Sequence, residues 1–72
     1  MKTNNITCTE QIIDDGIIAF KVQNTEYRIV DHSTEQGTMY LVHRAEEPSR
    51  AVWVDNIVQA RQVCKQDYMA RG

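Results

Sequence analysis

The chain has 72 residues, of which 42% are hydrophobic and 25% are charged, and its formal net charge is −2. Chains of this length bury only about 60% of the surface that they expose when unfolded, so we expect a single domain over residues 1–72 with one core. The small net charge excludes binding to polyanions or membranes by overall electrostatic attraction. No apolar run approaches the roughly 20 residues that a membrane-spanning helix needs, so we expect no membrane association.

The first segment, residues 6–13, is compatible with either a strand or a short helix. Thr7 and Glu10 have the spacing of a helix capping box. The strand is favoured because the segment is rich in threonine and leads into residues 14–16, an Asp-Asp-Gly turn that suits a hairpin with a bulge. We therefore expect a first strand, with the helix as the alternative.

Three further segments carry the β-branched and aromatic residues that are typical of strands, at residues 17–23, 26–32 and 38–43. The connections between them are short, which favours an antiparallel meander. With Asn24-Thr25 as the hairpin loop, aromatic and aliphatic side chains face each other across the first two of these strands. The pairs in this register are Val22 with Tyr27, Phe20 with Ile29, and Ile18 with Asp31.

A helix is predicted from Asp55, a good N-cap residue, to about Ala70, after a short apolar run at residues 51–54. One helical face carries an apolar stripe that we expect to cover the sheet, made of Ile57, Ala60, Cys64 and Tyr68, with Arg61 at its edge. Three more apolar residues lie off this stripe, namely Val58, Val63 and Met69, and are expected either to be wrapped by the sheet or to meet a partner. The predicted fold is α+β, a small antiparallel meander of three to four strands packed on one C-terminal helix.

Few residues are candidates for chemistry. Cys8 and Cys64 lie far apart and the sequence shows no leader peptide, so we expect a reduced, cytoplasmic protein. His32 and His43 match no metal-ligand spacing, and Cys64, on the apolar stripe, is better explained as core than as a nucleophile. The sequence has no phosphate-binding loop and no Gly-x-Ser-x-Gly motif. We expect no enzyme activity, no metal, no cofactor and no small-molecule substrate.

Protein binding is the leading functional hypothesis. If Phe20, Ile29 and Leu41 face the helix, the other face of the sheet has an apolar centre with a charged rim, which is typical of an interface. The residues predicted to bind a partner on that face are Arg28, Val30, Tyr40 and Val42. The partner is either another protein or a second copy in a homodimer, and the sheet edges offer a second route by strand addition. In the alternative reading, the N-terminal segment or the run around Trp53 covers this face.

A nucleic-acid-binding module is the alternative function, because a three-stranded sheet followed by a helix recurs among domains that lay a sheet in a DNA groove. The available cations are Lys21, Arg28 and Arg44 on the sheet and Arg61, Lys65 and Arg71 on the helix. Acidic residues in the same region, among them Glu26 and Asp31, oppose phosphate contacts. The sequence therefore does not favour this function.

Two stretches, Thr38-Met-Tyr-Leu-Val-His43 and Val52-Trp-Val-Asp-Asn-Ile-Val-Gln-Ala60, lead from short strands into one helix. This layout, over roughly residues 17–70, resembles small uncharacterised accessory proteins of bacterial phages, prophages and plasmids. The resemblance implies an accessory or inhibitory role that is carried out by binding. It assigns no functional residue.

Overall fold

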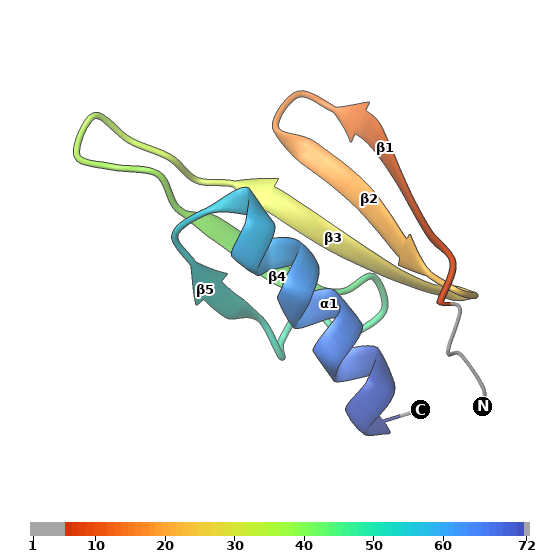
Figure 1. The fold of residues 1–72 in the computed structure, drawn as a ribbon. Coiled ribbons are helices and arrows are strands. Elements are labelled where there is room, and N and C mark those ends of the chain that lie inside the picture. Colours follow the sequence, from red (N-terminus) through yellow and green to blue (C-terminus); the bar gives the residue numbers. More distant parts are fainter. Residues whose placement is uncertain (1–5, 72) are drawn as a thin grey trace.

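Residues 6–71 are described in the computed structural model of the chain. The elements follow one another as β1 (Cys8–Asp14), β2 (Ile17–Val22), β3 (Thr25–Asp31), β4 (Tyr40–Arg44), β5 (Val52–Val54) and α1 (Ile57–Arg71). The strands form one antiparallel sheet in sequence order, and α1 lies across one of its faces (Figure 1). The predicted α+β architecture is confirmed, with a sheet of five strands in place of three to four.

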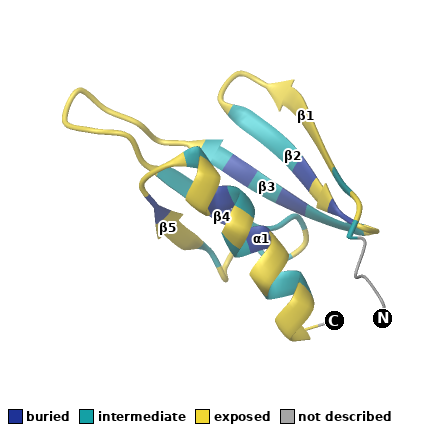
Figure 2. Ribbon diagram, in the orientation of Figure 1, coloured by how far each residue is buried: buried dark blue, intermediate teal, exposed yellow. Residues whose placement is uncertain are grey.

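The core lies between α1 and the middle of the sheet (Figure 2). Its side chains, none more than 9% exposed, are Phe20, Val22, Tyr27, Ile29, Val42, Val54, Ala60 and Cys64. The two helix residues in this set, Ala60 and Cys64, are small, which lets the helix backbone approach the strands closely. Ile57 and Tyr68 pack against this core from either end of the predicted apolar stripe. The helix face that was predicted to cover the sheet does so.

The first hairpin confirms the strand that was favoured for residues 6–13. β1 pairs antiparallel with β2, and the register shifts between Ile12 and Asp14, which is a β-bulge. Gly16 closes the turn with a φ of 74°, a left-handed conformation that glycine adopts without steric cost because it has no Cβ atom. The short-helix alternative for this segment is wrong.

The hairpin between β2 and β3 differs from the predicted register by two residues. The observed pairs are Val22 with Thr25, Phe20 with Tyr27, and Ile18 with Ile29. The loop is therefore Gln23-Asn24, and the predicted Asn24-Thr25 loop is wrong. Gln23 takes a φ of 56°, which is uncommon outside glycine, while the β-branched Thr25 joins the strand. Because the shift is an even number of residues, every side chain of β3 stays on its predicted face.

The apolar run before the helix is itself a strand. β5 pairs antiparallel with β4, with Tyr40 opposite Val54 and Val42 opposite Val52. β5 has three residues, fewer than the usual five or six of a strand. So short a segment does not show the alternation of apolar and polar residues by which a strand is predicted from sequence. It forms one edge of the sheet, and β1 forms the other.

The helix begins one residue later than expected, because Asn56 and not Asp55 is its N-cap. The Asn56 Oδ1 atom accepts a hydrogen bond of 2.7 Å from the Gln59 backbone N–H, and the Asn56 carbonyl accepts one of 3.1 Å from the Ala60 N–H. These two bonds are the ones that an N-cap residue makes. Asp55 lies outside the helix and contacts the Asn56 side-chain amide.

Replacing the two candidate caps separately tests this assignment. Asn56→Ala is expected to lower the free energy of unfolding by about 1 kcal/mol, because the Gln59 N–H loses its acceptor. The matched Asp55→Ala is expected to change it by only a few tenths of a kcal/mol. Urea denaturation of both variants measures the difference, and a larger loss from Asp55→Ala would refute the assignment.

Candidate functional site

Among the residues that the structure describes, one face of the sheet has no covering layer, and this face is called the open face below. Helix α1 packs on the opposite face, against Phe20, Ile29 and Val42, and successive residues of a strand point to alternate faces. The open face therefore carries Ile17, Ala19 and Lys21 of β2, Glu26, Arg28 and Val30 of β3, Leu41 and His43 of β4, and Trp53 of β5. Within residues 6–71, no helix or strand covers these side chains.

Four apolar residues of the open face stand side by side and form an apolar row. Ile17 pairs with Val30, Val30 with Leu41, and Leu41 with Trp53, so the row crosses four strands. The Trp53 side chain is 53% exposed, and the other three are half-buried by their neighbours within the sheet. A contiguous apolar surface of this kind on a small domain is typical of an interaction site.

Charged residues lie on the open face beside the apolar row. Arg28 is one pleat away from Val30 and forms an ion pair with Glu26 on the same strand. Lys21, on β2, lies across from Glu26 and is exposed. An apolar centre with a polar, solvated border is the usual arrangement of a protein interface.

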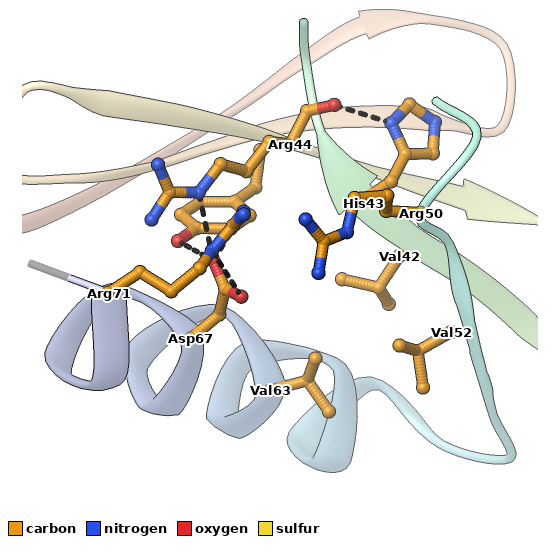
Figure 3. Close-up of a pocket in the computed structure, with 9 residues that line it drawn as sticks. Val42, His43, Arg44, Arg50, Val52, Val63, Asp67 and Arg71 are labelled. Atoms are coloured by element: carbon orange, nitrogen blue, oxygen red, sulfur yellow. Dashed lines mark hydrogen bonds and ion pairs between the residues drawn. The ribbon is translucent and has the colours of Figure 1, made fainter. Parts of the chain in front are cut away.

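Two histidines flank the apolar row. The His32 ring lies edge-on to the Trp53 ring, with centroids 5.2 Å apart and an interplanar angle of 70°, a favourable aromatic geometry. The Nδ1 atom of His43 lies 2.7 Å from the Arg44 carbonyl oxygen (Figure 3). Because a carbonyl oxygen only accepts hydrogen bonds, Nδ1 carries the hydrogen in this contact, and the His43 ring is held in place.

The structure separates the four residues that were predicted to bind a partner. Arg28 and Val30 lie on the open face. Tyr40 and Val42 lie on the helix face, and Val42 is only 1% exposed, so their placement beside Arg28 and Val30 is wrong. The reason is the register of β4, in which Leu41 stands opposite Val30.

Ile17, Leu41 and Trp53 are the members of the apolar row that the sequence analysis did not identify as partner-binding. The sequence of β4 is apolar at both alternate positions, so hydrophobic alternation does not choose its inner face. The pairing of β4 with β5 would have identified both residues as neighbours on one face, because it places Trp53 opposite Leu41. The alternative reading in which the run around Trp53 covers this face is wrong, since Trp53 extends the row at its edge.

The cations of the alternative nucleic-acid surface are divided between the two faces, and most are paired with carboxylates. Arg61 of α1 donates to Glu10 of β1 at 2.8 Å, and Arg28 pairs with Glu26 on the open face. Arg44 and Arg71 both bind Asp67. Paired cations on opposite faces do not form the continuous basic surface that phosphate binding needs.

A polar cluster on the helix face joins the end of α1 to the sheet (Figure 3). The Tyr27 hydroxyl donates to Asp67 Oδ2 at 2.7 Å, and Arg44 Nε donates to the same oxygen at 2.8 Å. Arg71 contacts the other Asp67 oxygen at 3.2 Å and donates to Glu47 at 2.7 Å. The cluster thus links β3, β4, the loop before β5 and the last turns of α1.

The cavity beside this cluster is small. Its volume is about 30 Å³, which is the space of about one water molecule. The Arg44 Nη2 atom is buried and has no hydrogen-bond partner within the protein. One water in the cavity would satisfy that nitrogen, so the cluster is better explained as a structural clamp than as a ligand site.

The clamp shifts the pKa values of its acidic members in opposite directions. Burial is the largest influence on Asp67 and raises its pKa, but the hydrogen bonds from Tyr27, Arg44 and Arg71 together outweigh it and leave the pKa below 3.8. Burial, and then the bond to Asp67, raise the pKa of Tyr27 to about 12. Both shifts favour an ionised Asp67 that accepts from a neutral Tyr27 at neutral pH.

The Asp67 shift predicts how acid affects stability. Because the folded pKa lies below the unfolded value near 3.8, the contribution of Asp67 is complete above that value and is lost as the pH falls through the folded pKa. Asp67→Asn is expected to reduce the loss of unfolding free energy that wild type shows as the pH falls through this range, because an asparagine at this position cannot be protonated. Urea titrations at a series of pH values measure the slope, and equal slopes for wild type and Asp67→Asn would contradict the prediction.

Cys64 is buried in the core between helix and sheet. Burial, followed by the negative charge of Asp67, raises the pKa of its thiol to about 12, so it holds almost no reactive thiolate at neutral pH. Among residues 6–71, no three His, Cys, Asp or Glu side chains gather closely enough to hold a metal ion.

Comparison of the chain with protein-family models, with curated proteins and with solved structures gave no significant match. In the described part of the chain, no helix has the length and apolar character needed to cross a membrane.

Proposed function

We propose that this chain is a non-catalytic binding protein that acts as an accessory or regulatory component, and that it binds a protein partner through the open face of its sheet. The observation that carries the proposal is the apolar row of Ile17, Val30, Leu41 and Trp53. Antiparallel sheets with one solvated face normally present polar residues on that face. A row of large apolar side chains across four strands departs from this pattern.

The free energy available from covering this row is substantial for a protein of this size. Complete burial of a large apolar side chain contributes about 1.5–3 kcal/mol, and the four members of the row still have surface to bury. A binding role also agrees with the resemblance of the layout to phage and prophage accessory proteins.

A nucleic-acid-binding module is the second candidate function. The observation in its favour is the exposed Trp53 ring beside His32 on an open sheet face, because aromatic rings on a sheet can stack with bases. The ion pairs made by Arg28, Arg44 and Arg61 oppose it.

Site-specific photocrosslinking in cells that produce the chain tests the proposal. Benzoylphenylalanine replaces Trp53, which is 53% exposed on the open face, or Met69, which is 60% exposed on α1 and serves as the matched control. We expect position 53, and not position 69, to give a discrete protein adduct. Equal adducts at both positions, or adducts at position 53 with nucleic acid alone, would refute the proposal.

A further inference from the structure

The helix leaves one corner of its own face of the sheet uncovered. Helix α1 lies over β2, β3, β4 and β5, and within residues 6–71 its backbone makes no contact with β1 (Figure 1). Ile12 of β1 pairs with Ile18 and therefore points to the helix face. It is nevertheless 75% exposed, more than any other large apolar side chain of the described residues. The fold of the single chain therefore does not bury the apolar surface at this corner.

A cavity of about 150 Å³ lies at this corner, on the helix face. Its apolar lining includes Ile12, Ile18 and Ile29, while Tyr40 adds an aromatic ring and Asp31 adds a carboxylate. Apolar cavities of about this volume accept a group the size of a benzene ring. The pocket therefore has room for one large side chain with an apolar body and a polar end.

The Asp31 carboxylate is the charged group of this pocket. It is exposed, and within residues 6–71 it forms no ion pair. The Ser33 backbone N–H donates to Asp31 Oδ1 at 2.8 Å, and hydrogen bonding by Ser33 holds the pKa of Asp31 below 3.8. The backbone of Asp31 donates to the Gly16 carbonyl oxygen at 2.8 Å, which fixes the first hairpin beside it. The pocket thus carries a positioned negative charge at neutral pH.

The end of the molecule around the pocket is acidic. Residues 12–18, 30–40 and 54–60 meet there through strand pairing (Figure 1). These three segments contain five carboxylates and no lysine or arginine, the acids being Asp14, Asp15, Asp31, Glu35 and Asp55. A surface with one sign of charge attracts partners of the opposite sign and repels those of the same sign. The partner that fits this end is basic.

We infer that this pocket is an anchor site for an arginine side chain that belongs to a basic segment of a partner protein. The aliphatic stem of arginine packs on apolar surface while its charged end stays accessible to water, which matches the isoleucine lining and the exposed Asp31. The planar guanidinium pairs with a carboxylate through two parallel hydrogen bonds and also interacts favourably with an aromatic ring such as Tyr40. A lysine provides the stem without the planar fork.

This inference goes beyond the proposed function, because the pocket lies on the helix face and the apolar row lies on the open face. It also distinguishes an arginine within a protein from the free amino acid. Free arginine carries an α-carboxylate, which the five acids of this end repel. An arginine within a chain has no such group.

NMR titration of the ¹⁵N-labelled chain with N-acetyl-arginine methylamide tests the pocket. We expect saturable shifts of the backbone amides of Gly16, Asp31 and Tyr40, which line the cavity. N-acetyl-citrulline methylamide has nearly the same shape without the charge, and is expected to bind about tenfold more weakly because it cannot form a charge-assisted pair. The lysine derivative is expected to lie between the two.

Two pairs of variants separate the pocket from general attraction to an acidic surface. Asp31→Asn keeps an oxygen that can accept from Ser33, and is expected to abolish the preference for arginine over citrulline. Asp55→Asn removes the same charge outside the pocket and should preserve that preference. Ile12→Ala is expected to weaken binding several-fold, whereas the neighbouring Ile13→Ala should not, because Ile13 does not line the cavity. Circular dichroism checks that each variant is folded.

Peptide probes identify the source of the arginine. Acetyl-Lys-Arg-Lys-amide is expected to bind several-fold more tightly than acetyl-Gly-Arg-Gly-amide at low salt, and free arginine is expected to bind more weakly than either. Tighter binding of free arginine would refute a protein partner at this pocket. The absence of saturable shifts, equal binding of the citrulline derivative, or an arginine preference that survives Asp31→Asn would refute the pocket itself. None of these results changes the expected crosslink at position 53, so the two proposals fail separately.

Discussion

The alternation of side chains along β2 and β3 is the constraint on which the rest of this structure depends. Ile18, Phe20 and Val22 can pack beneath α1 only if Ile17, Ala19 and Lys21 point away from it. The register of the β2–β3 hairpin fixes which side chains of β3 point toward the helix. The pairings of β3 with β4 and of β4 with β5 then fix the same for the last two strands. A single helix covers one face of the sheet, so the composition of the other face follows directly from the pairing.

The helix is held to the sheet by two different kinds of contact. Its first half packs through Ala60 and Cys64, which are fully buried. Its last turns have no comparable buried apolar residue, and Asp67 instead bonds to Tyr27 and Arg44. Hydrogen bonds and ion pairs depend on direction more strongly than apolar contacts do, so this clamp sets the position of α1 along the strands as well as adding stability.

Local patterns in the sequence were sufficient to predict the structure where nearby residues alone decide it. The Asp-Asp-Gly turn predicted the bulged first hairpin because Gly16 supplies the left-handed conformation. The helix stripe was predicted because a period of 3.6 residues places Ala60 and Cys64 on one face. Both are short-range features, and both are confirmed.

The sequence was insufficient where the outcome depends on a partner strand or on a choice between similar neighbours. Both alternations of β4 are apolar, so only its pairing with β3 shows that Val42 is buried beneath the helix and that Leu41 lies on the open face. Asp55 and Asn56 are both good caps, and the geometry of the first turn selects Asn56. The clamp around Asp67 joins residues that are 40 positions apart in the sequence, and no local pattern relates them.

The edges of the sheet support the proposed use of its open face over strand addition, because neither edge is well suited to pairing with another strand. β1, at one edge, is interrupted by a bulge beside Ile12, and its Glu10 is engaged by Arg61 of the helix. Bulges and charged residues are the features by which proteins prevent edge strands from pairing with other chains. β5, at the other edge, has three residues and offers few backbone groups. With both edges unsuited to pairing, the apolar row on the open face is the sheet surface that gains most from contact with a second protein.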